Sequence, residues 1–474
     1  MTMIRFLRYR VVCLAALLAS ATLAFAASTS HVFNVRDHGA AGDGTALDTA
    51  AINQAIEACA KSGGGQVLLP AGRYLSGTVH LRSRVTLFLD AGATLIGTTN
   101  LAAYQNPTLP AFMPEAKWGK WHRGLIIGEN VEDVAIAGTG VIDGNKVFDP
   151  TGEEKMRGPH AIIFVNCRRF TIRDVSIVDA ANYAVFFQIS DDVDIRNVKI
   201  TGGWDGVHLR GAPERWCRNV TITGCQFCTG DDAIAGRYWD NAIISGCVLN
   251  SSCNGIRVIG PITRTVIHDC LFFGPGRQPH RTSGAARRTN MLGGIILQPG
   301  AWDKTQGLLD DVLISGVTMH NVAAPVTIWT KPGNPVGRVA VNSLRATGVY
   351  RSAVSVENWG DQPIANVVLR DMNIEFSGGG KAEQASKPVK GPGVDPRPLP
   401  AWGFYARNVE QITFEDVRLS CAQDDFRPVV MADGVKRLNF DNFKFPRTAG
   451  VTEWLVTTNG GKVTLRDTTA PSAR

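Results

Sequence analysis

The chain has 474 residues and repeats a short phrase, and this repeat limits the possible folds more than any other feature. Clear copies are "FTIRDVSI", "VDIRNVKI" and "VTITGCQF", which begin at residues 170, 193 and 220. Each copy is a mostly β-branched apolar segment interrupted by Asp, Asn, Gly or, once, Ser. These interrupting residues lie at positions 174, 197, 224, 246, 269, 316, 343, 371, 416 and 442.

Most of these positions are 22 to 28 residues apart, and two longer gaps of 47 and 45 residues are interpreted as two coils each. A period of this length indicates a solenoid. Leucine-rich repeats have the same period, but the chain shows neither a leucine lattice nor a helix in each repeat. Asp, Asn and Gly tolerate left-handed backbone at a bend. The repeat therefore predicts an all-β protein, a right-handed parallel β-helix of about ten coils.

Three cysteines, Cys225, Cys247 and Cys270, directly follow a bend residue and share one phase of the repeat. We expect them to stack inside the solenoid as small apolar side chains rather than to form disulfides. Cys225 and Cys228 form a lone CxxC without a second pair, so we expect a structural role and no metal site.

The ends of the chain differ from the middle. Residues 48–61 have apolar side chains at helical spacing, with Asp48 or Thr49 at the start and Gly63 at the end. One helix before a stack of strands predicts a cap on the solenoid. The predicted divisions are a signal peptide (1–26), a cap with the first coils (27–100), a catalytic β-helix (101–445) and a C-terminal tail (446–474).

The first 26 residues carry three arginines, then an apolar stretch that ends in Ala24-Phe25-Ala26. This pattern predicts a cleaved secretory signal and a secreted or periplasmic protein. The alternative is an uncleaved membrane anchor. Without those arginines, 46 Lys and Arg face 42 Asp and Glu, a net charge of +4. Such a weak charge does not indicate nucleic-acid binding, and we expect a monomer that does not contact a membrane after signal cleavage.

The repeat also places carboxylates beside one another. Eight residues after successive bends lie Asn182, Asp205, Asp232 and Asn254, and adjacent coils are about 4.8 Å apart. Asp231 reaches the same face if Gly230 allows a local bulge. Crowded carboxylates repel, so at least one pKa should rise, which supplies an acid and a base for hydrolysis. The alternative is a solvated polar ladder on the outside of the solenoid.

At these residues the chain resembles glycoside hydrolase family 28, the polygalacturonase and rhamnogalacturonan-hydrolase family, from about residue 31 to residue 445. The quoted similarity lies in "FNVRDHGAAGDGTALDTAAINQAI", in "GTGVIDG" (138–144) and around the three aspartates. The resemblance implies that Asp231 is the general acid and that Asp205 and Asp232 activate water. It also implies inversion at the sugar carbon.

Two departures from the family pattern concern the substrate. The Gly-His-Gly motif falls at Cys253-Asn254-Gly255, which has no histidine, and the Arg-Ile-Lys motif falls near Ile295-Ile296-Leu297, which has no cation. Arg257, Arg287 or Arg288 are candidates to replace the missing cations. The full set of predicted substrate-binding residues is Asn254, His208, Arg210, Arg257, Tyr183, Trp204 and Asn182.

Three functional hypotheses follow. The leading one is an exported hydrolase of a pectic polysaccharide or oligosaccharide that needs no cofactor. The second is a β-helix lyase or epimerase, which is disfavoured because the patch lacks an obvious cationic base. The third is a non-catalytic glycan-binding β-helix.

For the hydrolase, the missing cations predict weak or no activity on polygalacturonic acid, and we expect activity on a branched or neutral-sugar-containing glycan instead. The long segments 101–124, 274–294 and 378–400 predict exo attack, because loops of this length are uncommon unless they are functional.

Overall fold

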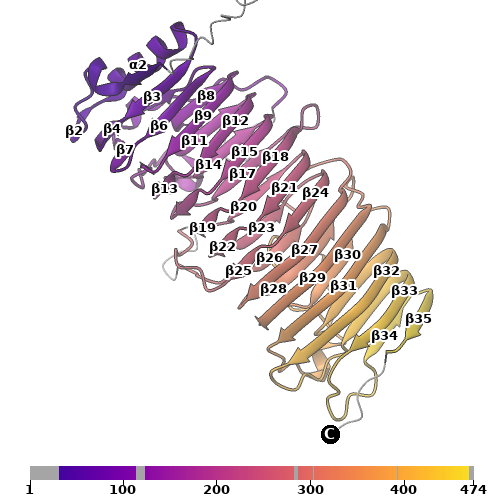
Figure 1. Cartoon of the computed structure of the whole chain (residues 1–474). Helices are drawn as coiled ribbons and strands as arrows, with labels where there is room; N and C mark the ends of the chain where they lie inside the picture. The colour runs from indigo at the N-terminus through magenta and orange to yellow at the C-terminus, as the bar shows by residue number, and fades with distance from the viewer. Residues whose placement is uncertain (1–30, 114–122, 282–286, 303, 392, 469–474) are drawn as a thin grey trace, which may run out of the picture. The chain divides into compact units, whose positions relative to one another are not determined.

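Parallel strands stacked coil on coil make up the fold. The computed structural model describes residues 31–113, 123–281, 287–302, 304–391 and 393–468. Within these ranges, the register of every pairing between named strands is parallel. Figure 1 shows the strands following one another as the colour runs from indigo to yellow. The protein is therefore a parallel β-helix, as the repeat predicts.

The first of three ladders of strands lies just before the predicted bends, and most of its strands alternate buried and more exposed residues. It consists of β1 (Val32–Asn34), β3 (Gly65–Leu69), β6 (Val85–Leu89), β9 (Glu132–Gly138), β12 (Arg168–Arg173), β15 (Asp191–Arg196), β18 (Cys217–Thr223), β21 (Trp239–Ser245), β24 (Ile262–His268), parts of β27 (Asp310–His320), β29 (Arg338–Val349), β31 (Ile364–Phe376), β32 (Phe404–Cys421) and β33 (Val430–Lys444), and β35 (Lys462–Arg466).

The second ladder follows the bends and has short strands in the first coils. It consists of β2 (Asp43–Leu47), β4 (Gly72–Ser76), β7 (Ala93–Gly97), β10 (Val141–Asp143), β13 (Ser176–Val178), β16 (Lys199–Thr201), β19 (Gln226–Thr229), β22 (Val248–Ser251) and β25 (Leu271–Phe273), and continues in the later parts of β27, β29, β31, β32 and β33.

The third ladder precedes the first one in each coil and carries the functional site. It consists of β5 (Val79–His80), β8 (Gly124–Glu129), β11 (His160–Val165), β14 (Val185–Gln188), β17 (Val207–Arg210), β20 (Ile234–Arg237), β23 (Asn254–Val258), β26 (Gly293–Leu297), β28 (Ala324–Thr330), β30 (Val354–Asn358), the first parts of β32 and β33, and β34 (Leu455–Thr458).

The ten predicted bend residues all have left-handed backbone, with φ between +47° and +68°. The sequence positions were therefore interpreted correctly: each coil turns at a residue type that tolerates this conformation. The ladders extend beyond the ten bends, towards the N-terminus through β9, β6 and β3 and towards the C-terminus through β35. The solenoid is longer than about ten coils for this reason.

The interpretation of the two long gaps as pairs of coils is wrong. Strand β24 pairs directly with β27, for example Thr265 with Val312, and β31 pairs directly with β32, for example Val367 with Ile412. Each gap is one coil enlarged by an inserted segment, between β25 and β26 in the first case and between β31 and β32 in the second. No degenerate repeat is hidden there.

Inside the solenoid, apolar side chains at alternate strand positions stack from coil to coil. Val193 and Ile195 of β15, for example, are buried between their register partners on β12 and β18. Fully burying such a side chain contributes about 1.5–3 kcal/mol. Cys225, Cys247 and Cys270 are also buried, as predicted, and none of the described cysteines forms a disulfide.

The N-terminal helix α2 (Thr49–Lys61) buries its apolar face and contacts β1, β3, β5 and β6 at the start of the ladders. It begins after Asp48, whose carboxylate accepts bonds from the backbone N–H groups of Ala41 and Gly42 instead of capping the helix. Gly63 follows the helix with a φ of +102°. Short 3-10 turns are η1 (Val35–His38), η2 (Leu101–Ala103), η3 (Glu153–Lys155) and η4 (Ala382–Gln384).

The structure differs from the predicted tail at 446–474. Residues there form β34 and β35, which pair with β33 and continue the solenoid. Their side chains are exposed or half-buried, so the apolar pattern that would reveal a coil is weak. The predicted signal peptide lies outside the described residues. Of the helices that are described, none has the length and apolar character needed to cross a bilayer.

Candidate active site

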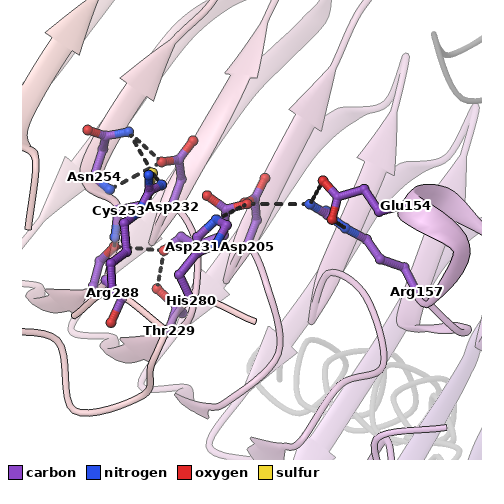
Figure 2. A network of polar contacts seen from close by, with 12 residues as sticks. Glu154, Arg157, Asp205, Thr229, Asp231, Asp232, Cys253, Asn254, His280 and Arg288 are labelled. Atoms are coloured by element: carbon purple, nitrogen blue, oxygen red, sulfur yellow. Dashed lines mark hydrogen bonds and ion pairs between the residues drawn. The ribbon is translucent and has the colours of Figure 1, made fainter. Parts of the chain in front are cut away.

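The carboxylates lie in the turns that lead from the second ladder into the third. Asp205 is in the turn before β17, and Asp231 and Asp232 are in the turn before β20. Backbone bonds link successive turns: the Gly206 N–H donates to the Asp232 carbonyl at 3.0 Å, and the Ala233 N–H donates to the Asn254 carbonyl at 2.9 Å. Asp205, Asp232 and Asn254 are thus in register on adjacent coils, as the repeat predicts (Figure 2).

The carboxylates of the adjacent residues Asp231 and Asp232 both reach the pocket because neither residue lies in a strand. Strand β19 ends at Thr229 and β20 begins at Ile234, so strand alternation does not apply between them. Gly230 is required by close approach and not by a positive φ, since a Cβ there would lie 2.6 Å from the Gly203 carbonyl oxygen. The tight contact between the two turns holds the aspartates together.

Replacing Gly230 by Ala is expected to lower kcat by on the order of a hundredfold, because the added Cβ pushes the Asp231 turn away from Asp205. A stability loss of about 2 kcal/mol should accompany it. Gly224→Ala is the matched control: its φ is +62° and its nearest neighbour atom would be 4.0 Å away. Kinetics and thermal unfolding check both variants, and equal kcat values in the two would contradict the role given to Gly230.

The aspartates line a pocket of about 280 Å³. Its walls come from segments far apart in the chain, including those between β10 and β11, between β25 and β26, and between β31 and β32. The lining residues are Glu153, Glu154, Arg157, Tyr183, Asp205, His208, Asp231, Asp232, Ala235, Cys253, Arg257, Ile259, His280, Arg288, Trp302, Val394 and Asp395.

One carboxylate oxygen from each of Asp205, Asp231 and Asp232 lies within 4.8 Å of the other two. The side chains of Asp205 and Asp232 are only 5% and 6% exposed, whereas that of Asp231 is 16% exposed. Asp231 is therefore the carboxylate that a ligand in the pocket reaches most easily. Since three negative charges this close repel one another, the cluster holds at least one proton.

Asp205 is buried beside His208, whose Nδ1 lies 2.7 Å from Asp205 Oδ2. Burial, together with the charges of Asp231 and Asp232, raises the pKa of Asp205 well above its usual range. Burial, with the positive charges of Arg210 and Arg237, holds the pKa of His208 well below its usual range. The pair therefore consists of a neutral imidazole and a carboxyl group that keeps its proton more readily.

Asp232 is held from the next coil. Its Oδ1 accepts from the Asn254 side-chain amide at 2.7 Å and from the Asn254 backbone N–H at 3.2 Å, and its Oδ2 lies 3.5 Å from Arg257 Nη1. Burial raises the pKa of Asp232, although Arg257 opposes this. Asn254 thus orients a predicted catalytic carboxylate.

Asp231 behaves differently from its neighbours. Burial tends to raise its pKa, but His280 and Arg157 more than offset this and hold the pKa of Asp231 well below its usual range. Arg157 Nη2 and His280 Nε2 each lie 3.6 Å from Asp231 Oδ2. The predicted rise in pKa thus occurs at Asp205 and Asp232, while Asp231 is the ionised member of the unliganded cluster.

Arg157 connects Asp231 to two glutamates. Its guanidinium is buried, lies 3.0 Å from Glu154 and 3.5 Å from Glu153, and covers the ring of Trp204 at 4.8 Å from the ring centroid. Burial raises the pKa of Glu153 to about 7, with Arg157 opposing. Figure 2 shows Arg157 and Glu154 approaching the aspartates from the side opposite His280 and Arg288.

Replacing Asp205 by Asn should stabilise the protein at neutral pH. Because the folded-state pKa of Asp205 is raised, the folded state binds more protons than the unfolded state from about pH 4 upward, so stability falls as pH rises through that window. The variant should show a higher apparent Tm than the wild type at pH 7 and nearly the same Tm at pH 4. Asp416→Asn at an exposed bend is the control, and parallel Tm–pH curves for wild type and Asp205→Asn would contradict the burial argument.

Of the seven predicted substrate-binding residues, Tyr183, His208 and Arg257 line the pocket. The Tyr183 ring stacks on His208 with centroids 4.6 Å apart. The other four are buried behind the pocket, so the structure does not support direct contact with a sugar. Trp204 is covered by the guanidiniums of Arg157 and Arg281, Asn182 accepts from Arg157, Asn254 orients Asp232, and Arg210 lies over the Phe186 ring.

Several pocket residues were not singled out from the sequence, among them Arg157, His280 and Trp302. Trp302 is 46% exposed and lies over the Arg257 guanidinium, so its ring is accessible to a ligand in the pocket. These residues belong to inserted segments outside the repeat, where the period gives no position. The only sequence signal for any of them was the unusual length of the 274–294 segment, which contains His280.

Two groups of side chains in the pocket have suitable atoms for a metal ion: Asp205, Asp231 and Asp232, and Asp231, Cys253 and His280. Arg157, Arg257 and Arg288 lie within 3.6 Å of members of these groups. Their positive charge disfavours a second cation at the same place. The absence of a metal cofactor stays a prediction.

Comparison with known proteins shows which families the chain resembles. Residues 32–257 match the family model described as rhamnogalacturonase A/epimerase, pectate lyase-like. An exo-poly-alpha-D-galacturonosidase from Dickeya chrysanthemi is 35% identical over 251 residues, which cover 43% of this chain and 41% of that protein. An exopolygalacturonase from Arabidopsis thaliana, clone GBGE184, is 24% identical over 385 residues, or 75% of this chain and 82% of that protein.

Solved structures agree on the fold. An exopolygalacturonase from Thermotoga maritima superposes with a TM-score of 0.60 at 20% identity and covers 73% of this chain and 87% of that one. The surface adhesin PfbA of Streptococcus pneumoniae has a TM-score of 0.59 at 18% identity, with 82% and 90% covered. Because an adhesin shares the architecture, the fold alone does not define activity.

Fold, carboxylate cluster and sequence relatives together define a glycoside hydrolase on a parallel β-helix. The chain is similar to the pectate-lyase-like proteins and, among them, to the polygalacturonases of glycoside hydrolase family 28.

Proposed function

We propose that the protein is an exported hydrolase that removes sugar units from the end of a galacturonate-containing pectic glycan, with inversion at the sugar carbon. The observation that carries this proposal is the cluster of three aspartates, with oxygens within 4.8 Å of one another, in a walled pocket. Export is supported by the basic and apolar N-terminal segment with its A-x-A site.

In this proposal Asp231 transfers a proton to the leaving glycosidic oxygen. It is the most exposed of the three carboxylates, and it lies 3.6 Å from the His280 imidazole, a group that can exchange a proton with it. Its low pKa in the unliganded pocket means that the proton must be supplied when substrate binds. Exclusion of water by a bound sugar favours the neutral carboxylic acid, because burial raises a carboxyl pKa.

Asp205 and Asp232 are assigned to the attacking water. Both carboxylates are almost fully buried, and His208 holds Asp205 while Asn254 and Arg257 hold Asp232. Because of this burial, we assign them to act on the sugar carbon through a bound water and not by direct contact. Inverting enzymes usually separate acid and base by about 6.5–9.5 Å. The closer spacing here is consistent with inversion if two neighbouring carboxylates hold one water together.

Attack at the chain end is supported by the pocket walls. Trp302, Val394 and Asp395 line one part of the pocket, and Glu153, Glu154 and Arg157 line another. A pocket with walls from several inserted segments suits a terminal sugar, whereas cleavage inside a chain requires a groove open at both ends. The alternative of a non-catalytic glycan-binding protein is disfavoured, since three repelling carboxylates in one pocket are costly for binding alone.

The choice of sugar depends on cations that the sequence motif lacks. Arg288 is partly exposed in the pocket, with Nη1 3.8 Å from Asp395 and Nη2 3.2 Å from Cys253 Sγ, and Arg257 lies beside it in the lining. These arginines support a uronate-containing substrate. They also change the expectation for polygalacturonate, from weak activity to release of terminal units.

The test is a time course on polygalacturonate, on rhamnogalacturonan and on a neutral plant polysaccharide, with products sized by chromatography. Early release of one small product from a pectic substrate, while the polymer stays long, is the expected result. Rapid formation of mixed oligosaccharides would contradict chain-end attack. Products that absorb in the ultraviolet from a new double bond would indicate a lyase, and binding without any product would indicate a glycan-binding protein.

A further inference from the structure

An inserted segment between β25 and β26 is fixed onto the turn that precedes the catalytic face. The Arg277 N–H donates to Asn250 Oδ1 at 2.8 Å, Asn250 Nδ2 donates to the Pro275 carbonyl at 2.9 Å, and Ser252 Oγ donates to the Gln278 carbonyl. The segment also closes on itself, through the bond from the His280 N–H to the Arg288 carbonyl at 2.9 Å. These bonds set the position of His280.

The His280 imidazole lies in the pocket beside the most exposed aspartate. Its side chain is 10% exposed, and its Nε2 is 3.6 Å from Asp231 Oδ2. One atom each of Asp231, Cys253 and His280 lies within 4.8 Å of the other two. Cys253 adjoins Asn254, which stands at the histidine position of the Gly-His-Gly motif, so this imidazole reaches the same neighbourhood from a different segment.

We propose that His280 is the positioning residue for Asp231: the two side chains share one proton, and His280 supplies it to the Asp231 carboxylate when substrate enters. This inference rests on the proposed function. The proposal adds His280, a residue outside the repeat, as the group that allows Asp231 to act as an acid. Without such a group, Arg157 would favour the ionised form of Asp231.

The proton balance closes without another reactant. Protonated His280 gives its proton to Asp231, and Asp231 passes it to the glycosidic oxygen as the bond to the sugar carbon breaks. The attacking water forms the new bond to that carbon and gives its proton to the Asp205–Asp232 pair. Neutral His280 then takes up a proton from solvent, and the carboxylate pair releases one.

The charged and titratable groups that face this pair are Asp231 in the turn before β20, Cys253 in the turn before β23, Arg288 in the same segment as His280, and Arg157 on the far side of Asp231. Arg157 keeps its charge throughout the pH range of interest. Histidine is the side chain whose charge ordinarily changes between pH 5 and 8. His280 is therefore the group beside Asp231 from which the proposed proton comes.

The first test needs no substrate. The imidazole of His280 is followed by NMR against pH in the wild type and in Asp231→Asn. Loss of the neighbouring anion should lower the His280 titration midpoint by about one pH unit. His268, which pairs with Asp269 on the surface at 2.8 Å, is the internal control and should not move. An unchanged His280 midpoint would overturn the sharing of a proton.

The second test measures kcat against pH for His280→Gln, with His268→Gln as the matched control. Without His280, only Arg157 remains beside Asp231, and its positive charge favours loss of the Asp231 proton. The alkaline limb of the kcat–pH profile should therefore move to lower pH. At pH 6, kcat should fall by roughly 10²-fold. Gln keeps a hydrogen bond but cannot carry the proton. Near wild-type kcat and an unmoved alkaline limb in His280→Gln would show a structural role and overturn the proposal.

The two tests separate this inference from the function on which it depends. If the wild type hydrolyses no pectic glycan, the proposed function fails, and the NMR titration still decides whether His280 and Asp231 share a proton. If hydrolysis occurs but neither the midpoint nor the alkaline limb responds, only the role of His280 fails.

Discussion

Asp231→Asn is expected to lower kcat by roughly 10³-fold on the true substrate while leaving the fold intact, because loss of one general acid typically costs about 10²–10⁴ in rate. Asn has nearly the same shape and can accept from Arg157, so the pocket should keep its geometry. Unfolding curves and kcat measured at several pH values check the result.

Asp194→Asn is the control, since this aspartate lies on β15 and pairs with Arg196 outside the pocket. It should leave kcat unchanged. The double variant Asp205→Asn/Asp231→Asn should lose much less than the product of the single losses, because the carboxylates act as a unit. Near wild-type kcat in Asp231→Asn would contradict the assignment of the acid.

Arg157→Leu is expected to have the second largest effect, on stability as well as activity. The guanidinium is 5% exposed and compensates Glu153, Glu154 and Asp231. Breaking a buried ion pair by removing one partner costs about 3–5 kcal/mol, because the charges left behind stay buried. The apparent Tm should fall markedly, and kcat should fall by on the order of a hundredfold as Asp231 shifts.

The control for this variant is Arg168→Leu, whose exposed pair with Glu132 should contribute less than about 1 kcal/mol. Arg157→Lys should fall between wild type and Arg157→Leu, since it keeps the charge but loses the planar fork. An Arg157→Leu protein as stable as Arg168→Leu would show that the buried network is not what holds this side of the pocket.

The fold could be predicted because each coil must turn at a residue that accepts left-handed backbone. Asp174, Asn197 and Gly224 are of the expected types, and their spacing carried the register to Asp205 and Asp232. A second series of left-handed residues includes Arg169 and Arg264, with φ of +53° and +46°. Other members, such as Asp192 and Asn219, are of the expected types, but the arginines interrupt the series and hide its period.

The site could be predicted only where it follows the repeat. Asn182 is displaced by one residue: the register pairs Val185 with Val207, so Tyr183, and not Asn182, is level with Asp205. Arg157, His280 and Trp302 lie in segments outside the period, and only tertiary contacts place them at the pocket. The two enlarged coils were misinterpreted for the same reason, since an insertion and a degenerate repeat lengthen a gap equally.

The order of pKa values could not be derived from crowding alone. Three adjacent carboxylates require that some pKa rises, but which one rises depends on partners that the repeat does not position. Burial and the charges of Asp231 and Asp232 raise the pKa of Asp205, whereas His280 and Arg157 offset burial and lower the pKa of Asp231.

The most direct test of the central claim is a proton NMR time course of the first product formed by the wild-type enzyme from a short pectic oligosaccharide. The account predicts that the sugar appears first with the anomeric configuration opposite to that of the cleaved bond, and that the other anomer grows in later by mutarotation. First appearance of the retained anomer would contradict a water held by Asp205 and Asp232, and a vinyl proton from an unsaturated product would contradict hydrolysis.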